Sequence, residues 1–331
     1  MYSPDELHGV MAMMPAFATG NASDITAMDT IDVEHLKAGV ERIIGDGIDV
    51  LATSGSYGEF HTLLWEEYVT LTHATVEAVK HRVPLFIGCT ALNSREVVRR
   101  MRVAREAGAE GVLVGVPFYF PSTVDNAIRF YRDIANLFPE LAIMIYHNPD
   151  LHNVTLPPGA FRELAAIPQV VGMKDSHRDT RGFIRLMQQT RGRVSVFVNA
   201  GQIYPFGELG ATGFWSHEVW MGPWPELALR DAIARGDTQA ALRIMLDLGE
   251  QPLASGEGLA VRQWLETASK LASGYGDYAQ PGPLRPPFVV IPPEVDQRVR
   301  KRAAYRQQLN ERYRPEVEAA RKREAAQPVL A

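Results

Sequence analysis

The sequence predicts a closed barrel of eight parallel strands, each followed by a helix, with a helical extension after the barrel. Short apolar runs rich in Val, Ile, Leu and Met alternate with amphipathic stretches whose apolar residues lie three and four apart. This alternation is typical of parallel strands joined by crossover helices. It repeats eight times within about 230 residues, which is the usual length of a TIM barrel, whereas an open doubly wound sheet usually has five or six strands.

The eight predicted strands are short, as expected of strands that are buried on both faces. They cover Val10–Met14, Val50–Ser54, Leu85–Cys89, Gly111–Val116, Ala142–Tyr146, Val170–Lys174, Val194–Asn199 and Gly213–Ser216. Helix starts are indicated by capping residues, such as Asn93 or Ser94 and Asp179 or Thr180. The predicted helices cover Val33–Asp46, Trp65–His81, Ser94–Ala107, Val124–Leu137, Pro158–Ala166, Thr180–Gln189, Ile203–Leu209 and Pro225–Ala234.

The pattern changes after Gly236, so we divide the chain into a barrel over residues 1–236 and a helical extension over residues 237–331. We expect the extension to pack on the barrel, because it shows neither a ninth strand nor a second core. Its predicted parts are helices over Asp237–Leu248 and Gly258–Leu271, a Pro/Gly hinge over Pro281–Pro287 and a charged helix over about Pro293–Ala325.

Composition excludes several classes of partner. Of the 331 residues 46% are apolar, and the formal net charge is -5, so the chain offers no broad cationic surface for nucleic acid or an anionic membrane. Cys89 is the single cysteine, which excludes an internal disulfide and a cysteine-rich zinc site and favours a reducing compartment, the cytoplasm. The segment Met1–His8 lacks the basic residues of a signal peptide. The longest apolar run, Gly111–Pro121, is far shorter than the roughly 18 residues of a membrane span.

A lysine at the end of the sixth predicted strand is the first candidate for chemistry. Lys174 directly follows the run Val170–Met173, and only six of the 34 basic residues are lysines. Burial in such a strand disfavours the ammonium form and lowers a lysine pKa, which leaves an amine able to attack a carbonyl. The alternative is a structural lysine that pairs with Asp175 or Glu59.

Two further features lie at the same predicted end of the barrel, where catalytic groups of this fold are found. Tyr146 ends the fifth strand, so its hydroxyl is placed to transfer protons beside Lys174, or it is simply a large side chain with one solvated end. Gly55, Ser56, Tyr57 and Gly58 follow the second strand, and the N–H groups of such a turn can bind a carboxylate. A tight strand-to-helix turn is the alternative.

Metal and cofactor chemistry are not indicated. The histidines show no i, i+4 pair around a carboxylate, as a zinc-binding helix would have. Magnesium-dependent barrel enzymes need acidic ligands at the ends of successive strands, where this chain has Tyr146, Lys174 and Asn199. We expect neither a metal nor an organic cofactor.

Four motifs in barrel order resemble the N-acetylneuraminate lyase and dihydrodipicolinate synthase superfamily of Schiff-base pyruvate aldolases. They are Gly55–Glu59, Pro117–Tyr119, Tyr146–Pro149 and Gly172–Asp175, and the resemblance extends over about Val10–Phe288. It implies a TIM barrel, a Schiff base on Lys174, no cofactor and a homotetramer.

Within that superfamily the chain most resembles the hydratase-aldolases of bacterial aromatic-hydrocarbon degradation. This resemblance rests on Asn148, Thr90–Glu96, Phe214–Ser216 and Leu284–Phe288. It implies cleavage of an aryl-substituted 2-oxobut-3-enoate, with water, to an aromatic aldehyde and pyruvate. A dihydrodipicolinate synthase-like condensing enzyme is one alternative, although those enzymes have an arginine where this chain has Leu151. A non-catalytic sensor of a 2-oxo acid is another.

The resemblance also implies roles for individual residues. Lys174 forms the imine, Tyr146 relays protons and Asn148 holds the water that adds to the alkene. Ser56 and Tyr57, with Gly55, bind the carboxylate of the substrate. Trp215 and Tyr119 stack on the aryl ring, or pack at the barrel rim, and Tyr119 is alternatively lent to a neighbouring subunit.

The loop after Lys174 bears on the choice of aryl group. Arg178 or His177 would favour a carboxylate on the ring, because a guanidinium pairs with a carboxylate through two hydrogen bonds but with a phenol through one. This reasoning favours trans-2'-carboxybenzalpyruvate over trans-o-hydroxybenzylidenepyruvate, which remains the alternative. Arg178 would have no such role if it paired with Asp175 or Asp179 on the surface.

Overall fold

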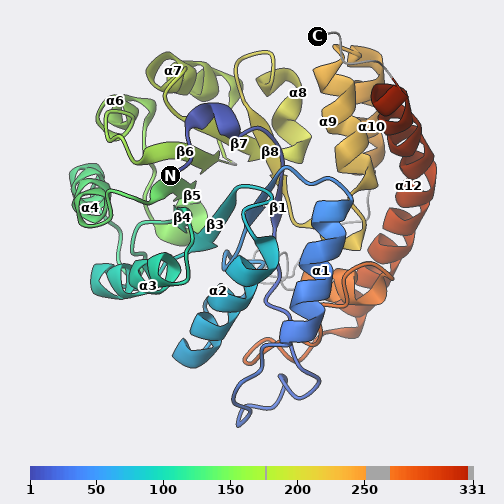
Figure 1. The fold of residues 1–331 in the computed structure, drawn as a ribbon, viewed down its shortest axis with the longest axis horizontal. Coiled ribbons are helices and arrows are strands. Elements are labelled where there is room, and N and C mark those ends of the chain that lie inside the picture. Colours follow the sequence, from blue (N-terminus) through green and yellow to red (C-terminus); the bar gives the residue numbers. More distant parts are fainter. Residues whose placement is uncertain (176, 251–268, 327–331) are drawn as a thin grey trace.

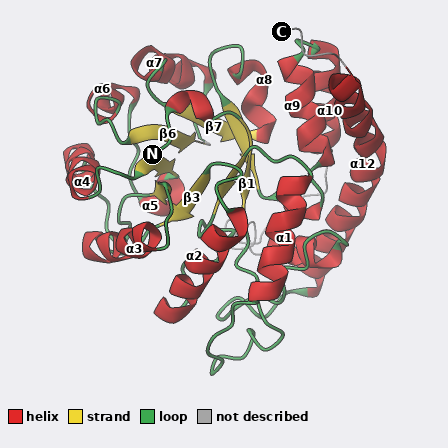
Figure 2. Cartoon of the chain, in the orientation of Figure 1, coloured by secondary structure: helices red, strands yellow, loops and turns green. Residues whose placement is uncertain are grey.

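The computed structural model describes residues 1–175, 177–250 and 269–326. Eight parallel strands form a closed barrel in sequence order, and helices surround it (Figures 1 and 2). The prediction of a TIM barrel is therefore confirmed. The strands are β1 (Gly9–Met13), β2 (Val50–Ala52), β3 (Leu85–Gly88), β4 (Gly111–Val114), β5 (Ala142–His147), β6 (Val170–Asp175), β7 (Ser195–Asn199) and β8 (Gly213–Ser216).

The long helices of the barrel follow the predicted amphipathic stretches. Asn93 and Asp179 cap two of them, because their side chains accept hydrogen bonds from the backbone N–H groups of Glu96 and Gly182. The long helices are α1 (Val33–Gly45), α2 (Trp65–Val79), α3 (Ser94–Glu106), α4 (Val124–Leu137), α7 (Thr180–Thr190) and α9 (Trp224–Ala234).

The short helices differ most from the predictions. The predicted helix Pro158–Ala166 is a 3-10 turn, η2 (Pro158–Ala160), and one helical turn, α6 (Phe161–Leu164). The predicted helix Ile203–Leu209 is the shorter α8 (Ile203–Phe206) after η3 (Ala200–Gln202). Three short helices have no counterpart among the predicted elements: α5 (Pro149–His152), η1 (Pro4–Glu6) and η4 (Glu218–Met221).

The C-terminal helices pack on one side of the barrel. α10 (Thr238–Gly249) and α12 (Pro293–Ala326) both contact α9, and α12 forms the outer edge of the molecule in Figure 1. Leu309, Tyr313 and Val317 of α12 are buried in the main core. Residues 269–275 are helical, while the rest of the predicted helix Gly258–Leu271 lies outside the described residues. In the described part of the chain, no helix is long and apolar enough to cross a membrane.

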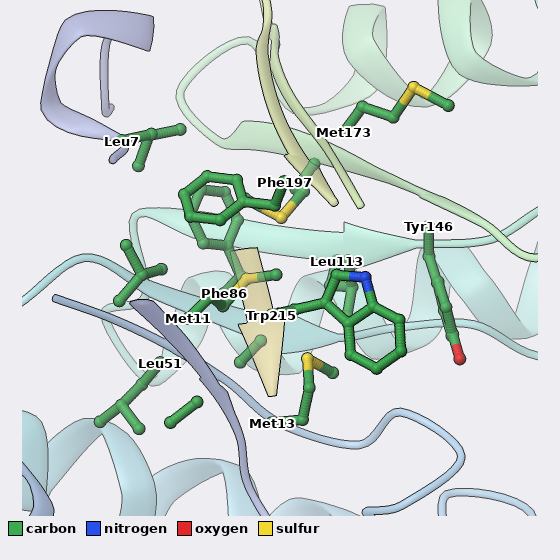
Figure 3. Close-up of a cluster of buried hydrophobic side chains, with 14 of the residues drawn as sticks. Leu7, Met11, Met13, Leu51, Phe86, Leu113, Tyr146, Met173, Phe197 and Trp215 are labelled. Carbon is green, nitrogen blue, oxygen red and sulfur yellow. The ribbon is translucent and has the colours of Figure 1, made fainter. Parts of the chain in front are cut away.

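The barrel interior is filled by side chains, so it is a core and not a channel. Figure 3 shows Leu7 on one side of this cluster and Trp215 and Tyr146 together on the other. The side with Trp215 and Tyr146 corresponds to the carboxyl ends of the strands, where the candidate residues lie.

Candidate active site

Lys174 and Tyr146 lie next to each other on neighbouring strands. The register of β5 and β6 pairs Tyr146 with Lys174. The Lys174 side chain is buried, and its Nζ lies 4.4 Å from the centroid of the Tyr146 ring and 3.7 Å from that of the Trp215 ring. Strand alternation thus directs both side chains into the barrel, at its carboxyl end. A buried amine next to a phenol is suited to carbonyl chemistry with proton transfer.

The turn after β2 contacts Tyr146 directly. The Ser56 hydroxyl lies 3.1 Å from the Tyr146 hydroxyl in a hydrogen bond between buried groups. Ser54 and Glu59, at the two ends of the turn, have left-handed backbone with φ values of 46° and 50°. A Cβ on Gly58 would lie 2.9 Å from backbone atoms of Met14 and Ser54, so only glycine fits there. The turn is therefore tightly wound against the barrel mouth, and binding of a carboxylate by its N–H groups stays a prediction.

Three rings form a wall beside Lys174. The Tyr57 and His217 rings lie 5.1 Å apart, and His217 stacks on Trp215 at 6.4 Å. The Trp215 indole donates a hydrogen bond of 3.2 Å to the backbone oxygen of Asp175. Burial lowers the pKa of His217 to about 3, with Arg302 and Lys174 adding to the effect, so this ring is neutral. The three rings thus place aromatic side chains next to the Lys174 amine.

His152 is a residue of the site that the sequence analysis missed. Its ring meets the Tyr146 ring edge-on at a centroid distance of 4.8 Å. A Cβ on Gly115 would lie 2.3 Å from the His152 ring, so the ring depends on a glycine in the loop after β4. Burial lowers the pKa of His152 to about 4, with smaller contributions from His147 and Lys174. The one sequence signal was its position four residues after Asn148, one helical turn away.

Asn148 lies at the start of α5, directly after β5. It is half-buried, and its carbonyl oxygen accepts hydrogen bonds from the N–H groups of Leu151 at 3.1 Å and His152 at 2.8 Å. Asn148 follows Tyr146 by two residues, between the end of β5 and α5, so it lies at the barrel mouth. The hydrogen bonds of the short helix hold its backbone there.

Arg178 and His177 lie on the other side of β6. Asp175 follows Lys174, so its side chain points away from the barrel interior. Its carboxylate binds Nδ1 of His147 at 2.9 Å, Nδ1 of His177 at 3.0 Å and Nε of Arg178 at 2.8 Å. Arg178 is buried and also donates to the Leu156 oxygen at 2.7 Å. One alternative from the sequence was that Arg178 pairs with Asp175 on the surface. The pair forms, but both side chains are buried.

These ion pairs hold Asp175 charged. Burial by itself raises a carboxyl pKa, but the hydrogen bonds from His147 and His177 and the charge of Arg178 outweigh it and place the pKa of Asp175 well below its usual value. His147, Asp175 and His177 bring three ligand atoms within 4.8 Å of one another. However, the Leu156 N–H donates to Nε2 of His147, which leaves Nδ1 as a donor to Asp175. The cluster is thus arranged for hydrogen bonding and not for holding a cation.

Tyr119 is far more exposed than the other predicted site residues. It is 72% exposed, its neighbour Phe120 is 75% exposed, and the two rings meet edge-on at 4.9 Å. The Tyr119 ring is not buried as Trp215 is, and its stacking on the substrate stays a prediction. Its exposure leaves the ring available to a neighbouring subunit, which was the alternative.

Comparisons with known proteins identify the family and similar proteins. The model of the dihydrodipicolinate synthetase family matches residues 18–268. The trans-o-hydroxybenzylidenepyruvate hydratase-aldolase of Pseudomonas putida is 31% identical over 302 residues, which cover 87% of this chain and 89% of that protein. The trans-2'-carboxybenzalpyruvate hydratase-aldolase of Nocardioides sp. (strain KP7) is 28% identical over 300 residues, with 87% and 89% covered. Among solved structures, PhdJ bound to a substrate intermediate superposes with a TM-score of 0.90 at 27% identity, over 94% of this chain and 99% of PhdJ.

Proposed function

The chain belongs to the dihydrodipicolinate synthetase family and is an enzyme, a lyase of the class I aldolase type, and from this premise we propose that it is a hydratase-aldolase. The proposed substrate is an aryl-substituted 2-oxobut-3-enoate, and the products are an aromatic aldehyde and pyruvate. The observation that carries the proposal is the buried Lys174 amine between the phenol of Tyr146 and the ring of Trp215. The names of the two hydratase-aldolases support the class of substrate.

The proposed mechanism begins at the turn after β2. The N–H groups of Ser56 and Tyr57 bind the substrate carboxylate, and the Lys174 amine condenses with the ketone, releasing water. The resulting protonated imine is conjugated to the alkene and withdraws electrons from it. A water molecule held by Asn148 then loses a proton and adds to the carbon next to the aryl ring, and the enamine that results takes up a proton at the adjacent carbon to give the hydrated imine.

Carbon–carbon cleavage follows from the hydrated imine. Tyr146, hydrogen-bonded to Ser56 at 3.1 Å, relays the proton of the new hydroxyl group: its oxygen takes up that proton while its own phenolic proton passes to Ser56, and the reverse relay later protonates the enamine carbon. The bond to the imine side breaks, its electron pair passes into the imine to give an enamine, and the aryl aldehyde leaves. Protonation and hydrolysis of the enamine release pyruvate and restore the amine of Lys174.

The positions of His177 and Arg178 bear on which aryl substituent is preferred. The preference for trans-2'-carboxybenzalpyruvate rested on Arg178 and His177, and both bind Asp175 on the outer side of β6. Trans-o-hydroxybenzylidenepyruvate is therefore an equal candidate for the substrate. Stacking of the ring on Trp215 serves either substrate.

Two other functions remain as alternatives to the hydratase-aldolase. A dihydrodipicolinate synthase-like enzyme would need a cation for a second carboxylate, where this chain has Leu151. A non-catalytic sensor would bind the 2-oxo acid without turnover. We propose a homotetramer, with Tyr119 presented to a neighbouring subunit.

Single-turnover release of aldehyde from each aryl oxobutenoate tests the function. The parent protein should release aldehyde and, with pyruvate and borohydride, form an adduct that peptide mass spectrometry maps to Lys174. Lys174→Ala should abolish both. Lys270 is a stringent internal control, because burial lowers the pKa of this lysine to about 8 and so makes its amine available for the same reaction. An adduct on Lys270, or adduct formation without aldehyde release, would contradict the proposal.

A further inference from the structure

A buried group of charges lies behind the turn that follows β2. We call Glu59, Lys270 and Arg285 the Glu59 cluster. The Lys270 ammonium contacts the Glu59 carboxylate and donates to the Pro283 oxygen at 2.9 Å. Arg285 donates to the same carboxylate through its guanidinium at 2.9 Å and through its backbone N–H at 3.2 Å. Two segments from the C-terminal part of the chain therefore hold one residue of the turn.

The cluster is anchored to the barrel on its other side. The Arg285 guanidinium donates to the hydroxyl oxygen of Thr30 at 2.8 Å and to its backbone oxygen at 2.7 Å. The N–H of Thr30 in turn donates to the Glu67 carboxylate at 2.8 Å, and Glu67 caps the first turn of α2. Because each charged group has several partners, the network fixes Glu59 in one position.

Stability alone is a weak explanation for such a cluster. Removing two cations and a carboxylate from water is costly, and an apolar replacement is often as stable. The backbone offers a more specific reason, since Glu59 has the left-handed φ of 50°. A non-glycine residue keeps such a conformation only where its surroundings enforce it, and such positions gather at binding sites.

A second contact from the same helical segment reaches the turn. The Ser273 hydroxyl lies 2.9 Å from the Tyr57 hydroxyl. Ser273 follows Lys270 by three residues, so both face the same side of the helix over residues 269–275. This face thus contacts two residues of the turn, Tyr57 and Glu59.

We infer that the Glu59 cluster and Ser273 are positioning residues for the carboxylate of the 2-oxo acid. They act through the turn, by holding the N–H groups of Ser56 and Tyr57 where the carboxylate binds. The inference rests on the proposed function, because it assumes that the turn binds the carboxylate of the substrate that condenses with Lys174.

The test compares two ketones that differ in charge. The yield of borohydride-trapped adduct is measured against the concentration of pyruvate and of its uncharged ester, methyl pyruvate. Lys270→Met should raise the half-saturating concentration of pyruvate by about tenfold, as expected when the placement of a charged hydrogen-bonding site is lost. The value for methyl pyruvate should change much less, because the ester has no carboxylate to place.

The matched control is an ion pair at the opposite end of the same strand. Arg230 binds Asp49 at 3.0 Å, directly before β2, and both side chains are about one-fifth exposed. Arg230→Met removes a cation of this pair without touching the turn, so it should leave both half-saturating concentrations unchanged.

A milder variant keeps the test decisive if Lys270→Met fails to fold. Ser273→Ala removes only the hydroxyl that contacts Tyr57, and it should weaken pyruvate relative to methyl pyruvate in the same direction. Equal losses for both ketones in these variants, or no loss, would overturn the inference while the parent still forms its adduct on Lys174. A parent that forms no adduct would instead contradict the proposed function.

Discussion

The hydroxyl of Tyr146 separates two steps of the proposed reaction. Replacement by Phe keeps the ring that lies against His152 and near Lys174, and it removes only the group hydrogen-bonded to Ser56. Tyr146→Phe should therefore lower kcat by ~10²–10⁴-fold, the usual contribution of a placed proton-transfer group. The fraction of protein trapped as pyruvate adduct at saturation should stay near that of the parent. Loss of adduct formation in parallel with kcat would show that the phenol is needed before cleavage.

Replacement of Arg178 tests whether this residue recognises the substituent on the aryl ring of the substrate. The guanidinium is buried with Asp175 and Leu156, on the helix side of β6. Arg178→Ala should therefore lower kcat/KM for trans-2'-carboxybenzalpyruvate and trans-o-hydroxybenzylidenepyruvate by similar factors. The substitution disturbs the end of β6 next to Lys174, and it leaves Trp215, on which the aryl ring is proposed to stack, in place. Steady-state kinetics with both compounds provides the measurement. A loss confined to the carboxylated substrate would restore the direct role that the sequence suggested for Arg178.

At the scale of elements, regular strands and long helices could be predicted and the short irregular ones could not. Amphipathic periodicity and capping residues such as Asn93 and Asp179 are local signals, and they place α3 and α7 closely. α6 and α8 are single turns, too short for periodicity to define. The residues of the site divide in the same way, into those with a local sequence signal and those without one. Lys174 and Tyr146 could be predicted from strand ends, whereas Lys270 and Arg285 meet Glu59 across more than 200 residues of sequence, which no local pattern reveals.

The contact between α12 and α9 contains another long-range pair with a measurable consequence. Arg306 is fully buried, binds the Glu226 carboxylate and donates to the Gly222 oxygen at 2.8 Å. Arg306→Met should lower the free energy of unfolding by ~3–5 kcal/mol, because it leaves Glu226 buried without its cation. Glu226→Gln combined with Arg306→Met should recover part of that loss, since the unpaired charge is then gone. Urea unfolding of the two single variants and the double variant gives the coupling energy, and simple additivity would contradict this account.

At the scale of the whole molecule, the neutral histidines around the barrel mouth make stability depend on pH. Burial lowers the pKa of His152 to about 4 and that of His217 to about 3, whereas an unfolded histidine titrates near 6.5. Between those values the unfolded chain takes up protons that the folded chain does not, so stability is complete above pH 6.5 and falls as the pH falls. The low pKa of Asp175 has the same sign, but its effect begins only when the pH falls into the usual carboxyl range, where the unfolded chain starts to protonate this group.

The free energy of unfolding should therefore decrease between pH 7 and pH 5, with each of the two histidines contributing ~2 kcal/mol at pH 5. His152→Phe keeps an aromatic ring of similar size against Tyr146 and removes the titrating group. Between pH 7 and pH 5, the free energy of unfolding should fall less in this variant than in the parent, by the ~2 kcal/mol that His152 contributes. This difference does not depend on the stability of the variant at pH 7. Urea titrations at several pH values measure the two slopes, which avoids comparing absolute stabilities. Identical slopes would mean that His152 takes up its proton in the folded state near the usual pKa, and that burial against Tyr146 and Gly115 does not keep the ring neutral.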